Sequence, residues 1–233
     1  MKIIAHGGVC GRAPKNTEIA FNEAVEAKAE EVEFDIHMSK DQEIVVIHDD
    51  SLDRTTDSSG KISKLTLKEI KKADAGSSFD QTYQGEKIPT LSETLEIVKN
   101  LDIINIEIKG NNTSDIFLKQ ILNTINDFNI KEKVIISSFN HFYLKQIKKI
   151  DSSINTGLLY FAGLYNPWDY AKNLEAEAIH PYYETITSKI VDKCHENGIK
   201  VNVFGSNQNH VMKYLKEKGV DSVITDFPEE TRN

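Results

Sequence analysis

The stretch EVEFDIHMSKDQEIVVIHDDSLDR, residues 31–54, decides how the rest of the chain is interpreted. Its first residues alternate between an apolar and a polar face: Val32, Phe34 and Ile36 against Glu33, Asp35 and His37. This period-two alternation predicts a half-buried β-strand. The polar run at 39–42 predicts a turn, and residues 43–47 predict a returning strand that ends at His48.

Glu33 and Asp35 lie on the same face of this strand, with side chains roughly 6–7 Å apart along it. Like charges at that distance repel, and such pairs commonly share a cation or divide an acid and a base role. With His48, one hairpin therefore carries two carboxylates and an imidazole. A surface hairpin with a solvated acidic face is the alternative interpretation of these residues taken alone.

Length and charge limit the class of protein. The chain has 233 residues, of which 39% are apolar, enough for one large core. Its formal net charge is −8, with acids and bases interspersed, which argues against a nucleic-acid partner because such proteins present a basic face. A phosphate ligand remains compatible, since a bound divalent ion can reverse the local charge.

Nothing in the sequence predicts a membrane segment or a leader. No run of 18 apolar residues is present, and the opening MKIIAHGG lacks a charged and then apolar leader. The two cysteines, Cys10 and Cys194, are too few for a disulfide framework and fit a reduced compartment. We therefore expect a cytoplasmic protein, and the sequence leaves its oligomeric state open.

Strands and helices alternate along most of the chain. Besides the strands that end at His6 and contain Glu33, strands are predicted at 103–108, 134–138, 156–160, 178–181, 200–204 and 222–225. Helices are predicted at 17–29, 91–98, 114–126, 141–150, 168–173, 188–197 and 208–218. Eight strand–helix units in about 230 residues predict an α/β fold of the closed (β/α)8 TIM-barrel type. An open doubly wound sheet is the alternative, but residues 7–11, GGVCG, match its GxGxxG turn poorly.

Residues 51–87 interrupt this alternation. They are polar and irregular, with one amphipathic helix near 65–72, and are expected to lack a strong core of their own. We interpret them as a small insertion into a single domain spanning 1–233 that covers a site as a lid, and a role as an interface is the alternative.

Chemistry in such a barrel lies at the carboxyl ends of the strands. The polar and aromatic residues predicted there are His6, Glu33, Asp35, Glu107, Lys109, Ser137, Ser138, Phe139, Tyr160, His180, Tyr182, Phe204 and Asp226. Glu107 would add a third carboxylate to Glu33 and Asp35, and an all-oxygen site suits Mg²⁺ or Ca²⁺. Alternatively, Glu107 pairs only with Lys109 inside the barrel.

Two histidines are candidates for proton transfer. His6 and His48 stand next to the predicted acids, and histidine titrates near neutral pH. Structural roles are expected for His37, His141, His195 and His210, whereas His180 remains open because its strand-end position could place it at the rim.

Short motifs follow one another in a fixed order. They are His6-Gly7-Gly8, Pro14-Lys15-Asn16-Thr17, Glu33-Phe34-Asp35, His48-Asp49-Asp50 with Leu52-Asp53-Arg54-Thr55-Thr56, Glu107-Ile108-Lys109 and Thr225-Asp226-Phe227-Pro228. As an ordered set covering essentially the whole chain, they resemble the motifs of glycerophosphodiester phosphodiesterases. The resemblance implies a (β/α)8 barrel with an insertion, and hydrolysis of glycerophosphodiesters to glycerol 3-phosphate and an alcohol.

The resemblance also implies residue roles. A divalent cation, Mg²⁺ or Ca²⁺, would be held by Glu33, Asp35 and Glu107. His6 and His48 would act as general base and acid, and Lys109 would contact the phosphate.

Three positions depart from the family pattern. Gly7 replaces an arginine, Lys15 replaces a glutamate, and Phe204 stands where a tryptophan is frequent, which keeps an aromatic wall. The lost arginine is a bidentate phosphate donor. Our hypothesis is that Lys15, or Arg12 in the same loop, now supplies the charge that faces the phosphate.

Two further functions remain open at this point. One is a lyase in which a neighbouring substrate hydroxyl attacks and a cyclic phosphate forms. The other is a catalytically weak barrel that binds phosphodiesters without turning them over, because a barrel fold alone does not decide function.

Overall fold

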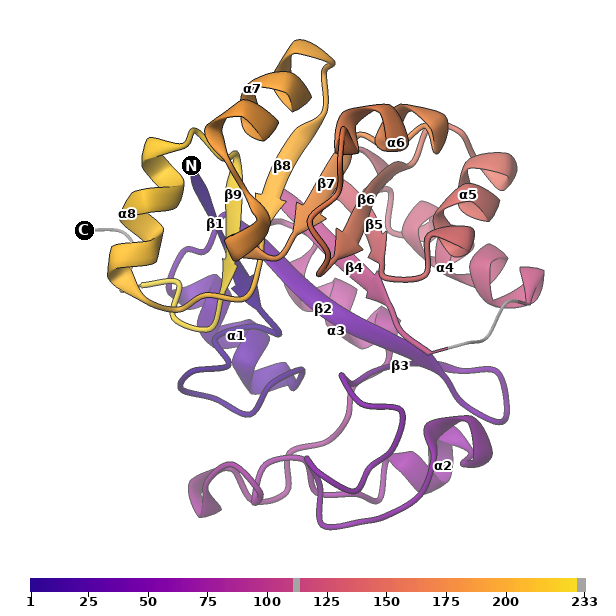
Figure 1. Cartoon of the computed structure of the whole chain (residues 1–233). Helices are drawn as coiled ribbons and strands as arrows, with labels where there is room; N and C mark the ends of the chain where they lie inside the picture. The colour runs from indigo at the N-terminus through magenta and orange to yellow at the C-terminus, as the bar shows by residue number, and fades with distance from the viewer. Residues whose placement is uncertain (111–113, 230–233) are drawn as a thin grey trace.

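The computed structural model describes residues 1–110 and 114–229, and one closed barrel dominates it (Figure 1). The strands are β1 Lys2–His6, β2 Glu31–Met38, β3 Ile44–Val46, β4 Ile103–Ile108, β5 Val134–Ser138, β6 Asn155–Tyr160, β7 Ala178–Pro181, β8 Lys200–Val203 and β9 Ser222–Thr225. Eight of them pair in parallel, and β1 closes the barrel by pairing with both β9 and β2. The predicted (β/α)8 barrel is confirmed, and the open sheet is excluded.

Helices connect the strands and surround the barrel (Figure 1). They are α1 Glu18–Glu26, α2 Leu67–Ile70, α3 Leu91–Val98, α4 Asp115–Asp127, α5 His141–Ile150, α6 Pro167–Asn173, α7 Ser188–Glu196 and α8 Asn209–Glu217, with 3₁₀ turns η1 Ile62–Lys64, η2 Gln81–Tyr83, η3 Lys131–Lys133 and η4 Tyr183–Thr185. Most begin at a side chain that accepts a hydrogen bond from the first turn, as Thr17, Thr90 and Ser114 do. These caps explain why the predicted helix starts hold to within one or two residues.

Strand β2 differs from its prediction in one respect. A half-buried strand was expected, yet all eight residues of β2 are buried. The apolar face packs against the surrounding helices, and the polar face points into the barrel, where neighbouring strands cover it. In this barrel strand, therefore, the apolar and polar residues alternate between the layer under the helices and the inside of the barrel, and neither face is exposed to solvent.

The strand register brings the polar residues together. Asp35 pairs with Glu107 across β2 and β4, and His6 pairs with Glu33 across β1 and β2. Paired residues of neighbouring parallel strands point to the same side of the sheet. Acids from β2 and β4 and the imidazole of β1 consequently meet at one end of the barrel.

The segment after β3 has more structure than expected. A small hydrophobic cluster joins it to β3, and its members are Val45, Ile47, Leu52, Ile62, Ile70, Ala73, Ala75 and Ile88. The segment therefore shares a small core with β3, which supplies part of the apolar surface it needs, and has no strong core of its own, as expected. The strand arrows point towards the side of the barrel on which this segment, with α2, lies (Figure 1). Whether the whole chain folds as one domain stays a prediction.

No helix among the described residues is long and apolar enough to cross a bilayer.

Candidate active site

Three buried carboxylates form the centre of the site. Glu33, Asp35 and Glu107 are at most 6% exposed. One oxygen from each lies within 4.8 Å of the others. Because β2 supplies two of the acids and β4 the third, the register of these strands builds the cluster.

Two lysines flank the acids. The Lys15 Nζ lies 3.1 Å from Asp35 Oδ2, while the Lys109 Nζ lies 3.2 Å from Asp35 Oδ1 and 2.6 Å from Glu107 Oε1. The expected alternative, an ion pair between Glu107 and Lys109, is thus present alongside the acid cluster rather than instead of it. Lys109 lies near the ring of Phe139 as well, 5.8 Å from its centroid.

Burial and neighbouring charges shift the pKa values of the three acids in different directions. Burial, followed by repulsion from Asp35, holds the pKa of Glu33 well above its usual range and raises the pKa of Glu107 to about 7. Burial alone would raise the pKa of Asp35 too, but the ammonium groups of Lys15 and Lys109 outweigh it and hold this pKa well below normal. The cluster therefore carries fewer than three negative charges when only the lysines face it.

The donor set fits a hard divalent cation. All three ligand groups are carboxylates, which Mg²⁺ and Ca²⁺ prefer. The Glu33 Oε2 atom is buried and receives no hydrogen bond from the described residues, and the nearest ion-pair partner, His6 Nε2, is 3.8 Å away. An unpartnered buried carboxylate oxygen aimed at two other acids is a natural cation ligand.

His6 is held by a carboxylate from the last strand. Its Nδ1 lies 2.5 Å from Asp226 Oδ1, and the Lys15 ammonium lies 2.6 Å from Nε2. The lysine can only donate, so Nε2 carries the lone pair and Nδ1 carries the proton. Burial, and then the charge of Lys15, lowers the pKa of His6, so its imidazole is neutral near pH 7.

Asp226 is itself held in place. The Asn207 Nδ2 donates to Asp226 Oδ2 at 2.6 Å, while the Asn207 Oδ1 accepts from the Asp226 amide at 2.9 Å. This grip fixes the carboxylate at the end of β9, where it meets His6 at the end of β1.

His48 has a similar arrangement with a different charge balance. Its Nδ1 lies 2.7 Å from Asp49 Oδ1, and Arg54 donates to both oxygens of Asp49 at 2.5 and 2.7 Å. Burial lowers the pKa of His48 also. The partner carboxylate of His48 is neutralised by an arginine, whereas that of His6 is held by a neutral amide.

The Gly7 and Lys15 positions are physically linked. A Cβ atom built on Gly7 would lie 2.3 Å from Lys15 Cγ, and Gly7 has a left-handed φ of 55°. The lysine stem therefore occupies the space that any side chain at position 7 would need. A glycine at position 7 and a long cation at position 15 form one compatible pair.

Arg12 is engaged elsewhere. Its guanidinium pairs with Glu229 and lies 3.8 Å from Glu23 Oε2. Neither partner belongs to the acid cluster, so the geometry favours Lys15 over Arg12 as the cation beside it.

Aromatic side chains gather at the ends of β5, β6, β7 and β8. Phe204 contacts Phe139, Phe161 and Tyr182, with ring centroids 5.2–5.9 Å apart. Phe139 and Phe161 are stacked at 4.9 Å, and Phe161 is 62% exposed. Exposed stacked rings beside a polar centre offer an apolar wall to a ligand.

Two cavities flank the acids. One of about 400 Å³ is lined by His6, Lys15 and His48 and by Phe79 of the segment after β3, so this segment forms one wall as expected. The other, of about 500 Å³, is lined by Glu107, Lys109 and Phe139 among others.

The other histidines have structural partners or lie in solvent. His37 contacts the His48 carbonyl, His141 contacts Tyr170 and the Leu159 carbonyl, and His195 contacts Asp221. His210 is exposed. The sequence left the place of His180 open. Its side chain is fully buried inside the barrel and does not lie at the rim, and Asn202 donates a hydrogen bond to its Nε2 at 3.1 Å.

Several site residues had been given no role from the sequence. Asn16 donates to Asp35 Oδ2 at 2.8 Å, and Asp49, Arg54 and Asn207 orient the histidines. Asn16 offered one signal, since it belongs to the motif Pro14-Lys15-Asn16-Thr17, and in the structure its left-handed φ of 62° suits asparagine. Asn207 offered none, because it reaches Asp226 from another loop.

A family model matches almost the whole chain. The model described as "Glycerophosphoryl diester phosphodiesterase family" matches residues 6–230. The chain is 41% identical to a protein named "Glycerophosphodiester phosphodiesterase" from Caldanaerobacter subterraneus subsp. tengcongensis, covering 97% of this chain and 94% of that relative. It is 33% identical to a protein of the same name from Bacillus altitudinis, covering 98% and 95%.

Solved structures agree with this similarity. A phosphodiesterase from Oleispira antarctica, described in complex with the product sn-glycerol-3-phosphate, superposes with a TM-score of 0.93 at 30% identity, covering all of this chain and 95% of that one. A glycerophosphodiester phosphodiesterase from Thermotoga maritima superposes with a TM-score of 0.79 at 27% identity, covering 98% and 95%.

Proposed function

The chain belongs to the glycerophosphodiester phosphodiesterase family and is a hydrolase of glycerophosphodiesters; from this we propose that it releases sn-glycerol 3-phosphate and an alcohol, using a divalent cation held by Glu33, Asp35 and Glu107. The observation that carries the proposal is the meeting of three carboxylates with two carboxylate-bound histidines at one end of the barrel. A cytoplasmic location remains part of the proposal.

Glu33, Asp35 and Glu107 would supply the oxygen ligands of Mg²⁺ or Ca²⁺. When bound, the cation would act as a Lewis acid on a phosphoryl oxygen. Its charge would permit all three acids to ionise at once, which the two lysines alone do not achieve.

His6 would act as the general base. The Asp226 carboxylate holds the proton on Nδ1 and leaves the lone pair on Nε2. The Lys15 ammonium, which donates to this lone pair, would turn to the phosphate when a diester binds. A neutral imidazole so held can take a proton from the attacking water.

His48 would act as the general acid towards the leaving alcohol. Because Arg54 neutralises Asp49, this carboxylate stabilises an imidazolium less than Asp226 does. His48 would have to be protonated when the diester binds, and an imidazolium that is less stabilised then gives up its proton more readily.

Lys15 would bind the phosphate together with Lys109. Its ammonium already lies between Asp35 and His6, and Gly7 leaves it the room to do so. We expect Lys15→Ala to raise KM for a diester by about tenfold or more, because a charge-assisted hydrogen bond contributes about 1.5–3 kcal/mol. Lys213→Ala, at an exposed position of α8, is the control. An unchanged KM in Lys15→Ala would end this assignment.

Phe204, with Phe139 and Phe161, would form the wall that receives the alcohol part of the substrate. Of these rings, Phe139 lines the cavity that Lys109 also lines.

The experiment for the main proposal measures glycerol 3-phosphate released from glycerophosphocholine and glycerophosphoethanolamine, with Mg²⁺, with Ca²⁺ and with a chelator. We expect release that the chelator abolishes, and a loss of about 100-fold or more in His6→Ala. His210→Ala, an exposed histidine, serves as the control. A cyclic phosphate as the end product would replace hydrolysis by the lyase reaction, and full activity of His6→Ala would refute the mechanism.

A second experiment tests the cation site without activity. A cation at about 100 times its Kd should stabilise the fold by about 2.7 kcal/mol and raise Tm by about 5–10 °C. Glu33→Gln should abolish this shift, whereas Glu31→Gln, two residues earlier on the same buried strand, should retain it. Equal shifts in both variants would place the cation elsewhere.

A further inference from the structure

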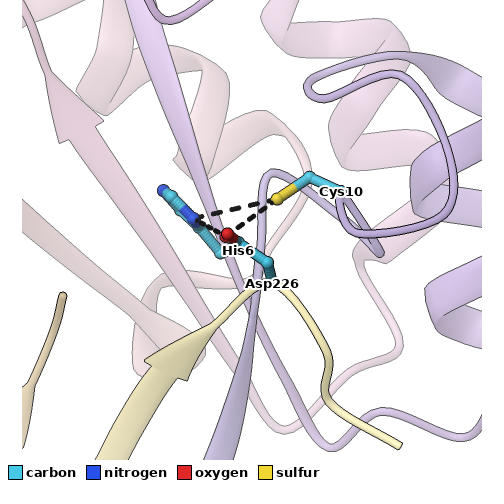
Figure 2. Close-up of side chains that lie close together, drawn as sticks. All are labelled: His6, Cys10 and Asp226. Atoms are coloured by element: carbon cyan, nitrogen blue, oxygen red, sulfur yellow. Dashed lines mark hydrogen bonds and ion pairs between the residues drawn. The ribbon is translucent and has the colours of Figure 1, made fainter. Parts of the chain in front are cut away.

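We infer that His6, Cys10 and Asp226, called here the thiol cluster, form a second metal site that takes a thiophilic divalent cation such as Zn²⁺ and thereby blocks the enzyme. Figure 2 shows the three polar atoms of these side chains at the corners of one triangle. His6 serves the proposed reaction through Nε2, Asp226 serves it by holding the proton on His6 Nδ1, and Cys10 has no part in it.

The distances suit a small metal ion. The Cys10 Sγ lies 3.0 Å from Asp226 Oδ1 and 3.8 Å from His6 Nδ1, and Nδ1 and Oδ1 are 2.5 Å apart. Around tetrahedral zinc, with bonds of about 2.0–2.3 Å, ligand atoms lie roughly 3.3–3.6 Å from one another. The sulfur–nitrogen distance of 3.8 Å lies just above this range, and the two distances to Asp226 Oδ1 lie below it. A movement of the Asp226 carboxylate by about 1 Å, with a slight approach of the thiol to the imidazole, would bring all three atoms into range.

The fold brings the cysteine to this place through a glycine. A Cβ on Gly11 would lie 2.3 Å from the ring of Phe227, and the Gly11 amide donates to the Asp226 carbonyl at 3.0 Å. Only a residue without a side chain permits the loop after β1 to lie so close to the end of β9. This close contact places Cys10 beside Asp226 (Figure 2).

The carboxylate is prepared for a ligand role. Asn207 occupies Oδ2 of Asp226 at 2.6 Å and leaves Oδ1 directed at the thiol and the imidazole. Metal-binding carboxylates are commonly held in this manner by a second hydrogen bond. His6, Cys10 and Asp226 also line the cavity of about 400 Å³, which has room for a water molecule as the fourth ligand.

The thiol selects a different cation from the acid cluster. A thiolate is a soft ligand that favours Zn²⁺, whereas three carboxylates favour Mg²⁺ or Ca²⁺. Burial, and then the charge of Asp226, raises the pKa of the Cys10 thiol, which is therefore protonated and donates to Asp226 until a cation displaces its proton. The two sites thus divide cations by ligand type, a few ångströms apart.

Binding of Zn²⁺ to this site would prevent His6 from acting as the general base. This part of the inference rests on the role proposed for His6 above. The thiol proton passes to solvent as the Cys10–metal bond forms. The imidazole proton leaves Nδ1 for Nε2, because a neutral imidazole with a metal on one nitrogen carries its proton on the other. The Lys15 ammonium, which can only donate, then has to give up its contact with Nε2. Nε2 then has no lone pair with which to accept a proton from water.

Cobalt spectroscopy tests the site without reference to activity. Protein saturated with Mg²⁺, in a phosphine reductant, is titrated with Co²⁺, and the thiolate-to-cobalt charge-transfer absorption is recorded. We expect this absorption in the wild type and in Cys194→Ala, and its loss in Cys10→Ala and Cys10→Ser. Cys194 is the matched control, since it is the other cysteine of the chain and is buried in the core.

Inhibition tests the consequence. With Mg²⁺ present, the Zn²⁺ concentration that halves each protein's own zinc-free rate should rise by about tenfold or more in Cys10→Ala, and stay unchanged in Cys194→Ala. A missing cobalt–sulfur absorption in the wild type, or one that survives in Cys10→Ala, would overturn the metal site. Equal zinc sensitivity in all three proteins would overturn its inhibitory role. An absorption present in a protein that hydrolyses no diester would leave the site intact and refute the proposed function instead.

Discussion

At the scale of single residues, the two histidines differ in what holds them rather than in their own chemistry. Asp226 faces His6 and is gripped by Asn207, whereas Asp49 faces His48 and is paired with Arg54. A carboxylate beside imidazole fixes the tautomer and the ring orientation. Asp226 is therefore a positioning residue for His6.

Asp226→Asn should lower kcat by about 100-fold or more while KM stays nearly constant, because an amide can also donate to Nδ1 and so favour the wrong tautomer. Steady-state kinetics measure the two constants, and the ¹⁵N resonances of the His6 ring report the tautomer. Asp50→Asn, at an exposed acid beside Asp49, is the control. A fall in kcat without any change of tautomer would reduce Asp226 to a structural role.

Gly7→Ala should destabilise the protein by about 1–3 kcal/mol, from its left-handed φ and from contact with the Lys15 stem. In the Lys15→Ala background only the backbone part, about 1 kcal/mol, should remain. Urea unfolding measures both values. Gly198→Ala, at φ 73° with open space around it, should have the same cost in either background. Strictly additive effects of the Gly7 and Lys15 changes would show that the two positions are independent.

At the scale of elements, hydrogen bonds inside the segment after β3 stabilise one wall of the cavity of about 400 Å³ that His6 and His48 line. Asp74 accepts bonds from the Gly76 amide, from both the amide and the hydroxyl of Ser77, and from the Gly85 amide. Tyr83 ties the same segment to the loop after β1 by donating to the Arg12 carbonyl at 2.9 Å. The wall that carries Phe79 thus depends on one buried carboxylate and on a contact between loops.

Asp74→Ala should accelerate hydrogen exchange at the amides of Gly76, Ser77 and Gly85 by about tenfold or more, because three donors lose their acceptor. The KM for a diester should also rise in Asp74→Ala, since Ser78 and Phe79 line the cavity of about 400 Å³ beside the two histidines. Asp80→Ala removes a carboxylate that accepts from Thr82 in the same segment and is the control. Unaltered exchange in Asp74→Ala would mean that other contacts hold the wall.

At the scale of the whole molecule, the barrel encloses polar side chains in layers along its axis. Gly157 on β6 leaves space for His180 on β7, because a Cβ there would lie 2.4 Å from the His180 ring. Burial lowers the pKa of His180 to about 3. The unfolded chain binds a proton at this residue below about pH 6.5, whereas the folded barrel does not until about pH 3, so folding loses stability as pH falls through this interval.

His180→Gln should therefore be less sensitive to acid than the wild type. Between pH 6.5 and 5 the wild type should lose about 2 kcal/mol that the variant keeps, at about 1.4 kcal/mol per pH unit. Urea unfolding at several pH values measures the difference. His210→Gln, at an exposed histidine, should follow the wild type throughout. Parallel curves for wild type and His180→Gln would show that His180 titrates alike in both states.

The sequence by itself determined the barrel and the identity of its central acids. Period-two alternation and helix caps are local signals, so β2, the helix starts and the order of strands could all be predicted from neighbouring residues. The placement of Glu33, Asp35 and Glu107 at strand ends follows from the same local register once eight parallel strands are assumed.

Only the tertiary structure decided which partners these residues have. Asn207 meets Asp226, Cys10 meets His6, and the Lys15 stem fills the space over Gly7, through contacts between loops that no local pattern encodes. Burial has the same origin: a polar strand face becomes interior only when the barrel closes, and closure is what shifts the pKa values of the acids and of His180. The local sequence pattern therefore determined the helices and strands. The closure of the barrel and the contacts between loops determined the protonation and the partners of the site side chains.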